Sequence, residues 1–324
     1  MKILVTGATG FIGQNLVERL LQEGYDVLCV TRKPIAENLF GRKVENIVLD
    51  LQEIEKLGRR MDGVDVVIHM AAQLGHYGIP YEYFYQVNYM ASVKLAKLAI
   101  QYGVKQFILC SAPFVVGLGK RSSGEDEPYA PKDAYSETKM LAELGIINVC
   151  EGRIPYTVLR PSYVYGKGDV RRVSLYKSIE KKYFVLTTNG KAYIHPTYVS
   201  DIVDGFLLAI MNENAYGEIF NLGAEKDCTA LEYLRCIAEN VGSRLIQINI
   251  GYGLSGVFAD TVDVLCKRII HKAGFVNRGR IDFFAKDHSC NIEKAKEKLG
   301  YRPKISLEEG VRMSIAWARD KGYM

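Results

Sequence analysis

The sequence feature that most constrains the fold is the segment Thr6-Gly-Ala-Thr-Gly-Phe-Ile-Gly13, directly after the apolar run Ile3-Leu4-Val5. Three glycines three residues apart, between a strand and a helix, are typical of the turn where a doubly wound α/β fold holds a dinucleotide pyrophosphate. The helix N-terminus adds partial positive charge there. The alternative is a strand–helix turn that binds nothing. We predict a cofactor loop made of Gly7, Thr9, Gly10, Phe11, Ile12 and Gly13.

The first half of the chain alternates strand and helix patterns. Helices are expected at 11–22, 81–102 and 134–149. Such alternation predicts a parallel sheet covered by helices on both faces, the doubly wound or Rossmann arrangement of the α/β class. The expected strands are 2–6, 26–30, 46–49, 64–70, 106–110 and 156–160.

The pattern loosens after Gly166, and this change suggests two domains. We predict a dinucleotide-binding domain over 1–166, with 193–222 returning to its sheet. Residues 167–192 and 223–324 would form a smaller, mixed and mainly helical substrate-binding domain. The cleft would lie between the two, at the carboxyl ends of the strands.

Composition narrows the range of partners. The 324 residues carry a mild net charge of +5 with interspersed signs, which does not favour nucleic-acid binding. Seven cysteines without C-x-x-C spacing indicate reduced thiols in a cytoplasmic protein, and five scattered histidines indicate no metal site. No apolar run approaches the ~18 residues of a membrane span, so we expect a small-molecule substrate and no membrane partner.

Tyr135-Ser-Glu-Thr-Lys139 stands at the start of an expected helix. Positions i and i+4 share a helix face, so the phenol and the ammonium point the same way. A nearby cation favours the phenolate and lowers the phenol pKa, so Tyr135 would exchange a proton with a substrate hydroxyl or carbonyl. The alternative is a surface pair, because this spacing is common. We predict that Tyr135 and Lys139 are catalytic.

With these motifs, the chain resembles the extended short-chain dehydrogenases/reductases of the NAD-dependent epimerase/dehydratase type. The resemblance covers nearly the whole chain. Besides the glycine loop and the Tyr135–Lys139 pair, it rests on Asp50-Leu51, His69-Met-Ala-Ala72, Asn88, Leu159-Arg-Pro-Ser-Tyr-Val-Tyr-Gly166, His195-Pro-Thr-Tyr-Val-Ser-Asp201, Phe220-Asn-Leu-Gly223 and Leu299-Gly-Tyr-Arg-Pro303.

The resemblance also implies roles for single residues. Lys139 would hold the nicotinamide ribose as well as lower the Tyr135 pKa. Relatives often dimerise through helices equivalent to 81–102 and 134–149, so a homodimer is expected. The further cofactor contacts would be Asp50 and Leu51 beside the adenine, Ala71 and Ala72 along the channel, and Pro161 to Tyr163 beside the nicotinamide. Ordinary loop packing also explains Ala71, Ala72 and Pro161.

One departure from the family concerns cofactor choice. The second strand of NAD-using relatives commonly ends in an acidic residue that bonds the adenosine ribose. Here it ends Val30-Thr31-Arg32-Lys33. Thr31 does not repel a 2′-phosphate and Arg32 can clasp one, so we predict NADP in preference to NAD. Alternatively, Arg32 stacks over the adenine or stays solvated.

A second departure lies in Cys110-Ser-Ala-Pro-Phe-Val-Val-Gly117. The family usually places a catalytic Ser or Thr five residues before this glycine, where this chain has Ala112. Either Ser111 takes that role, or it is a strand-end hydroxyl bonded to backbone and another group or a water replaces it. The dehydratases use an Asp-Glu pair in the region of Pro113-Phe114, so dehydration is disfavoured.

We predict hydride transfer at a secondary alcohol or ketone carbon, by an oxidoreductase or epimerase whose substrate is a nucleotide sugar. Charges for its diphosphate would come from Arg171, Arg172, Lys177 and Lys191. One alternative is an NADPH-dependent reductase of a lipophilic hydroxy or keto compound, similar to hydroxysteroid dehydrogenases or dihydroflavonol reductases. Another is a non-catalytic NADP-binding sensor, made conceivable by Ala112.

Overall fold

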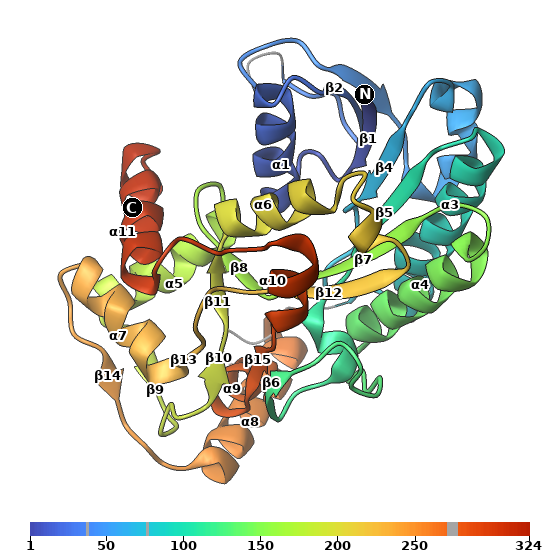
Figure 1. Cartoon of the computed structure of the whole chain (residues 1–324). Helices are drawn as coiled ribbons and strands as arrows, with labels where there is room; N and C mark the ends of the chain where they lie inside the picture. The colour runs from blue at the N-terminus through green and yellow to red at the C-terminus, as the bar shows by residue number, and fades with distance from the viewer. Residues whose placement is uncertain (37–38, 76–77, 271–277) are drawn as a thin grey trace.

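A seven-stranded parallel sheet forms the centre of the computed structural model, which describes residues 1–36, 39–75, 78–270 and 278–324 (Figure 1). The strand order is β12-β7-β5-β4-β1-β2-β3. Direction along the sheet reverses between β1 and β4, the place where doubly wound folds open a crevice. All six expected strands are present, and β12 extends the sheet by one. The strands are β1 (Lys2–Thr6), β2 (Asp26–Thr31), β3 (Glu45–Val48), β4 (Val66–His69), β5 (Gln106–Cys110), β7 (Tyr156–Pro161) and β12 (Glu218–Leu222).

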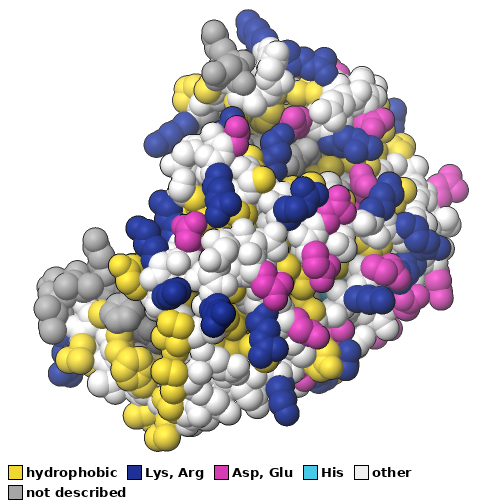
Figure 2. Space-filling model, turned by 90° about the vertical axis from the view of Figure 1, so that its left-hand side faces the viewer, with side chains coloured by type: hydrophobic (Ala, Val, Ile, Leu, Met, Phe, Trp, Pro, Cys, Tyr) yellow, Lys and Arg dark blue, Asp and Glu magenta, His cyan; other side chains and the backbone are white. Residues whose placement is uncertain are grey.

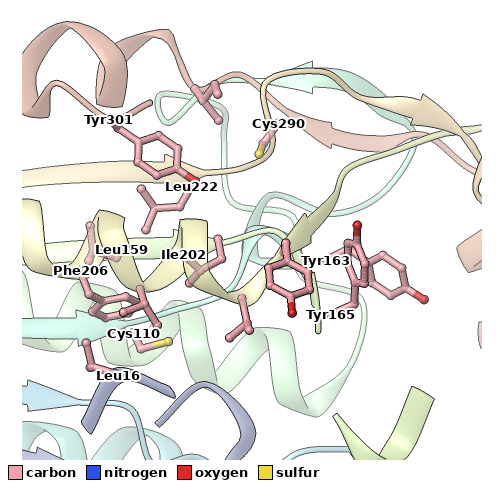
Figure 3. Close-up of a cluster of buried hydrophobic side chains, with 14 of the residues drawn as sticks. Leu16, Cys110, Leu159, Tyr163, Tyr165, Ile202, Phe206, Leu222, Cys290 and Tyr301 are labelled. Atoms are coloured by element: carbon pink, nitrogen blue, oxygen red, sulfur yellow. The ribbon is translucent and has the colours of Figure 1, made fainter. Parts of the chain in front are cut away.

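Helices cover both faces of this sheet, as predicted. Alternate side chains of β1 enter different cores: Ile3 and Val5 join one, and Leu4 joins the other. In the first core, Figure 3 shows Ile202 and Phe206 of α6 near sheet residues. The first face carries α1 (Phe11–Gln22) and α6 (Val199–Ala209). The second carries the 3-10 segment η1 (Leu51–Met61), α3 (Ala91–Gln101) and α4 (Ala134–Cys150).

The expected continuous helix over 81–102 is interrupted. A short helix α2 (Tyr81–Phe84) leads into the π-helical turn η2 (Tyr85–Met90), and α3 follows. A π-turn accommodates one extra residue per turn without ending the helix, and an apolar sequence pattern does not reveal it. The turn contains the buried residue Asn88.

The C-terminal part is mixed and mainly helical, as predicted. Within 193–222, only β12 joins the main sheet; β10 and β11 pair elsewhere. The domain boundaries stay a prediction. The helices are α5 (Val170–Glu180), α7 (Ala230–Asn240), α8 (Tyr252–Ile270), α9 (Arg278–Ala285), α10 (Glu293–Leu299) and α11 (Leu307–Asp320). The paired short strands are β6 (Lys120–Ser123) with β15 (His288–Cys290), β8 (Tyr163–Tyr165) with β11 (Pro196–Tyr198), β9 (Val185–Leu186) with β14 (Ile246–Gln247), and β10 (Tyr193–Ile194) with β13 (Cys228–Thr229).

The seven cysteines are free thiols; Cys228 and Cys266 are half-buried and the others are buried. Among the described residues, no helix combines the length and apolar character needed to cross a membrane. The described residues also contain no group of three or more His, Cys, Asp or Glu side chains that could hold a metal ion. The cytoplasmic location and the homodimer stay predictions.

Candidate functional site

A cavity of about 550 Å³ opens at the carboxyl ends of the central strands. Its walls come mainly from the segments that follow β1, β2, β3, β4, β5 and β7, together with the start of α4; α2, η2 and α5 add one or two residues each. Every residue that the sequence predicted to be catalytic or to contact the cofactor lines the cavity. These residues are Gly7, Thr9, Gly10, Phe11, Ile12, Gly13, Thr31, Arg32, Asp50, Leu51, Ala71, Ala72, Ser111, Tyr135, Lys139, Pro161 and Tyr163.

The glycine loop has the geometry of a phosphate cradle. Gly7 has a φ of +73°, which an L side chain rarely adopts. A Cβ on Gly13 would lie 2.1 Å from the Gly7 carbonyl oxygen, so only glycine allows the helix to pack this closely. Gly10 caps α1 without a side-chain hydrogen bond, which leaves N–H groups of the first turn available to an anion. The loop therefore fits a dinucleotide pyrophosphate.

A buried hydrogen-bond network supports the cavity wall after β4. The Thr6 Oγ1 atom accepts from the backbone N–H groups of Met70 and Ala71, each at 3.2 Å. His69 bridges Thr6 Oγ1 at 2.7 Å and Ser92 Oγ at 2.9 Å. Burial lowers the pKa of His69 to about 3, so its ring is neutral. These bonds fix the backbone that leads into the wall.

At the end of β2, the two residues predicted to select NADP over NAD differ in burial and in contacts. Thr31 is buried, and its hydroxyl donates to the Lys33 carbonyl at 2.7 Å and accepts from the Asn46 amide at 2.7 Å. Arg32 is exposed on the cavity rim and, within the described residues, makes no ion pair. Its guanidinium is therefore available to an anionic ligand.

Tyr135 and Lys139 both reach the cavity from the first turns of α4, where a capping box of Asp133 and Ser136 starts the helix. The Lys139 ammonium donates to the Cys110 carbonyl at 2.6 Å, and burial lowers its pKa. The expected lowering of the Tyr135 pKa by Lys139 is not what the structure shows. Burial dominates and raises that pKa, because removal from water disfavours the phenolate.

Ser111, not Ala112, supplies a hydroxyl at the end of β5. Both residues line the cavity and both are buried. The Ser111 backbone N–H donates to the Leu159 carbonyl at 2.7 Å, but its Oγ has no hydrogen-bond partner among the residues that the structure describes. The alternative that this hydroxyl is bonded to backbone is therefore wrong. An orphaned buried hydroxyl facing a cavity is a candidate ligand contact.

Only two of the four cations expected at a diphosphate reach the cavity. Arg171 and Arg172 line it, whereas Lys177 and Lys191 are exposed elsewhere. The Arg172 guanidinium stacks 3.6 Å from the centre of the Tyr163 ring, donates to its hydroxyl and lies 3.3 Å from an Asp169 carboxylate oxygen. Neither Lys177, on α5, nor Lys191, in the loop before β10, is part of the cavity wall, so the structure does not bring these two lysines to the predicted diphosphate site.

Comparison with known proteins agrees with this geometry. The model of the NAD-dependent epimerase/dehydratase family matches residues 3–223. The chain belongs to that family. A sterol-4-alpha-carboxylate 3-dehydrogenase (decarboxylating) from Mus musculus is 26% identical over 97% of this chain and 90% of its own length. A 3 beta-hydroxysteroid dehydrogenase/Delta 5-->4-isomerase from Mycobacterium tuberculosis (strain CDC 1551 / Oshkosh) is 28% identical over 96% and 88%. The UDP-glucose 4-epimerase from Thermotoga maritima, solved with UDP-glucose, superposes with a TM-score of 0.79 at 25% identity, over 99% of each chain.

The protein is therefore an NAD(P)-dependent enzyme of the extended short-chain dehydrogenase/reductase type. Its relatives by name act on sterols, steroids and nucleotide sugars. Membership of this family agrees with the predicted fold class and with a nucleotide-binding glycine loop.

One structural feature of this family member was missed from the sequence. Arg160 of β7 and Glu143 of α4 form a two-pronged ion pair, with N–O distances of 2.9 and 2.7 Å, and both side chains are almost fully buried. The Tyr129 hydroxyl donates to the same carboxylate at 2.8 Å. An arginine inside the otherwise apolar strand pattern 156–160 was the available signal, because a buried charge requires a partner.

Asn88 is a second positioning residue, on the π-turn η2. Its amide exchanges two hydrogen bonds with the Gln73 backbone, at 2.7 and 3.1 Å, and donates to Thr138 Oγ1 at 3.0 Å. Gln73 lines the cavity, and Thr138 lies next to Lys139 on α4. Asn88 thus ties the cavity wall to the helix that carries Tyr135.

Proposed function

We propose that this enzyme transfers a hydride at the secondary alcohol or ketone carbon of a lipophilic compound, with NADP(H) as its preferred cofactor. The observation that carries the proposal is the nature of the cavity wall. Lining residues without a predicted cofactor role are mostly apolar, among them Leu74, Tyr83, Val87, Pro113, Phe114 and Val164. An apolar wall with few polar groups favours an apolar ligand.

The polar groups of the site are arranged for general acid catalysis, in which a side chain donates a proton to the oxygen on the reacting carbon of the substrate. When bound, the nicotinamide cofactor supplies or accepts the hydride. Because burial raises its pKa, the Tyr135 hydroxyl stays protonated near neutral pH and can donate to a carbonyl oxygen. The orphaned Ser111 hydroxyl supplies a second hydrogen bond to that oxygen. Lys139, held by the Cys110 carbonyl, contributes positive charge and a donor for the ribose.

The preference for NADP rests on the end of β2. No carboxylate stands at Thr31, so a 2′-phosphate meets no repulsion there, and exposed Arg32 can pair with it. Two lipophilic-substrate enzymes among the relatives support the substrate class by their printed names, a sterol and a steroid dehydrogenase.

A nucleotide sugar is the second candidate substrate. It is favoured by the similarity to UDP-glucose 4-epimerase and by Arg171 on the cavity rim. Against it, Arg172 already contacts Tyr163 and Asp169, and Arg171 lies 3.8 Å from a carboxylate oxygen of the same Asp169, so both arginines already have a partner that a diphosphate would have to displace.

A substrate panel tests the proposal. The protein is mixed with NADPH or NADH and either long-chain and polycyclic ketones or nucleotide sugars. Consumption of NADPH with the lipophilic ketones is expected. Isomerised nucleotide sugar without net cofactor consumption would contradict the proposal in favour of an epimerase. Cofactor binding without turnover of any compound would support the non-catalytic alternative.

A further inference from the structure

The helix α8 turns an apolar face outward. Leu254, Val257 and Phe258 have exposed fractions of 66%, 61% and 52%, and Leu265, eleven residues after Leu254, is 51% exposed. Spacings of three, four, seven and eleven residues place side chains on one helix face. Ser255 and Ala259 lie on the opposite, buried side of the helix. Globular proteins normally bury such a stripe, so its outward position indicates a binding surface.

This surface extends beyond the helix itself. The paired strands β9 and β14 precede α8 in the chain. Exposed Val185 belongs to β9, exposed Ile248 and Ile250 lie between β14 and α8, and Tyr183, just before β9, is 79% exposed. Figure 2 shows hydrophobic side chains gathered in the lower left of that view. We call the exposed face of α8 together with these four residues the α8 surface.

Cations border the α8 surface. Lys181 and Lys182 directly precede Tyr183, and Arg268 follows Leu265 by about one helical turn. All three are exposed, and no acidic side chain within the described residues pairs with them. Asp260, an acid on α8, is instead paired with Arg278. An apolar face bordered by unpaired cations is complementary to a membrane surface that carries anionic lipids.

A chain of aromatic rings connects this surface with the cavity. Tyr163 in the cavity wall lies 4.5 Å, centre to centre, from Phe283 of α9, and Phe283 lies 5.1 Å from Phe284. Phe284 lies 5.9 Å from Phe184, the neighbour of Tyr183. Helix α9 thus packs against Tyr163 of the cavity wall and, through Phe284, against the segment that carries Tyr183 of the α8 surface.

From these observations we propose that the α8 surface docks on the headgroup and upper acyl region of an anionic membrane. It does so without spanning the bilayer, and so departs from the expectation of no membrane partner. Its purpose, delivery of a lipophilic substrate from the bilayer, rests on the proposed function; the docking itself rests only on the surface. A second copy of the chain is a poorer occupant, because a two-fold contact would bring the same cations together.

Vesicle sedimentation tests the docking without cofactor or substrate, so failure of the proposed reaction does not affect its outcome. We expect the full chain to sediment with vesicles of phosphatidylcholine and phosphatidylglycerol, and much less with phosphatidylcholine alone. Leu254→Ser combined with Phe258→Ser should lower the partition coefficient about tenfold or more, since two apolar anchors are lost. Lys181→Gln with Lys182→Gln should lower it about tenfold on anionic vesicles only.

The matched control is Leu208→Ser on α6, which replaces another exposed leucine and should sediment like the wild type. Wild-type protein that stays in solution with both vesicle types would overturn the proposal. So would serine variants that sediment unchanged. Sedimentation velocity tests the alternative that the α8 surface binds a second copy of the chain. If the wild type self-associates but does not bind vesicles, and the Leu254→Ser, Phe258→Ser variant no longer self-associates, the surface is a contact between copies and not a membrane site.

Discussion

The chemistry of this site depends on a one-residue displacement of a hydroxyl. The family position five residues before Gly117 is Ala112. The neighbouring Ser111 lines the same cavity as Tyr135, and its buried hydroxyl has no hydrogen-bond partner in the described part of the chain. A side chain that leaves a donor unpaired costs stability unless a ligand uses it. Ser111 is therefore the residue whose replacement should affect turnover without affecting the fold.

Ser111→Ala should lower kcat by about 10²–10³-fold, the usual loss for one donor to a reacting oxygen. The dissociation constant for NADPH should change little, because this hydroxyl lies beside the reacting group. Steady-state kinetics and fluorescence titration measure the two quantities. Ser162→Ala is the matched control, as Ser162 is also a buried serine on the cavity wall. A loss seen only in the Ser162 variant would assign the role to that residue instead.

Cofactor preference should respond to the end of β2. Thr31→Asp places a carboxylate where a 2′-phosphate would approach, so NADPH affinity should fall by about tenfold or more while NADH affinity is kept. Arg32→Ala should weaken NADPH selectively. Titration of the wild type with both reduced cofactors is the reference, and tighter binding of NADH than of NADPH would contradict the proposed preference for NADP.

Sequence reasoning located these site residues because their motifs are local. The glycine loop and the Tyr135–Lys139 spacing are short and carry their own geometry. Sequence reasoning failed where segments that are distant in the chain determine a residue's contacts or its pKa. The Tyr135 pKa is set by burial, and Lys139 bonds to Cys110, which is 29 residues away. Likewise Arg172 is committed to Tyr163 by a fold-dependent contact.

At the scale of elements, the buried Arg160–Glu143 pair joins strand β7 to helix α4. That helix carries Tyr135 and Lys139, and the strand leads into Pro161 on the cavity wall. Two charges in the core stabilise the fold only while both are present, since each compensates the desolvation of the other.

Glu143→Gln should therefore lower the free energy of unfolding by about 3–5 kcal/mol, because the Arg160 guanidinium is left buried without its counter-charge. Urea denaturation measures this loss. In the double variant Arg160→Met, Glu143→Leu, most of the loss should be recovered. Glu53→Gln, in an exposed ion pair with Lys56, is the control and should change stability by less than about 1 kcal/mol. An equally small effect at Glu143 would contradict this reading of the pair.

The elements themselves were predictable to different degrees. Strand and helix alternation gave the sheet and its covering helices because each pattern is read within a few residues. The π-turn η2 was not predicted, because its side chains keep an almost α-helical periodicity. The short strand pairs were not predicted for another reason. In one of them, β6 near residue 120 pairs with β15 near residue 290, and no local sequence pattern encodes a pairing over such a separation.

At the scale of the whole molecule, stability should depend on pH through buried neutral histidines. Burial lowers the pKa of His69 to about 3, and it also lowers the pKa values of His195 and His288. An unfolded histidine takes up its proton near pH ~6.5. Between these values the unfolded chain binds more protons, so stability falls as the pH falls below about 6.5.

From about pH 7 to about pH 5, His69 alone should remove about 2 kcal/mol of unfolding free energy. Urea denaturation at several pH values measures the slope. His69→Gln should make the slope shallower by about 1.4 kcal/mol per pH unit. A slope that is the same in both proteins would show that His69 does not titrate on unfolding as described.

The central claim, that Tyr135 donates the proton while a lipophilic ketone is reduced in this cavity, is tested most directly by one comparison. Initial rates of NADPH oxidation are measured with a long-chain or polycyclic ketone for the wild type and for Tyr135→Phe. The account predicts a rate about 10²–10⁴-fold lower in the variant, with the NADPH dissociation constant nearly unchanged. Equal rates in the two proteins would contradict it.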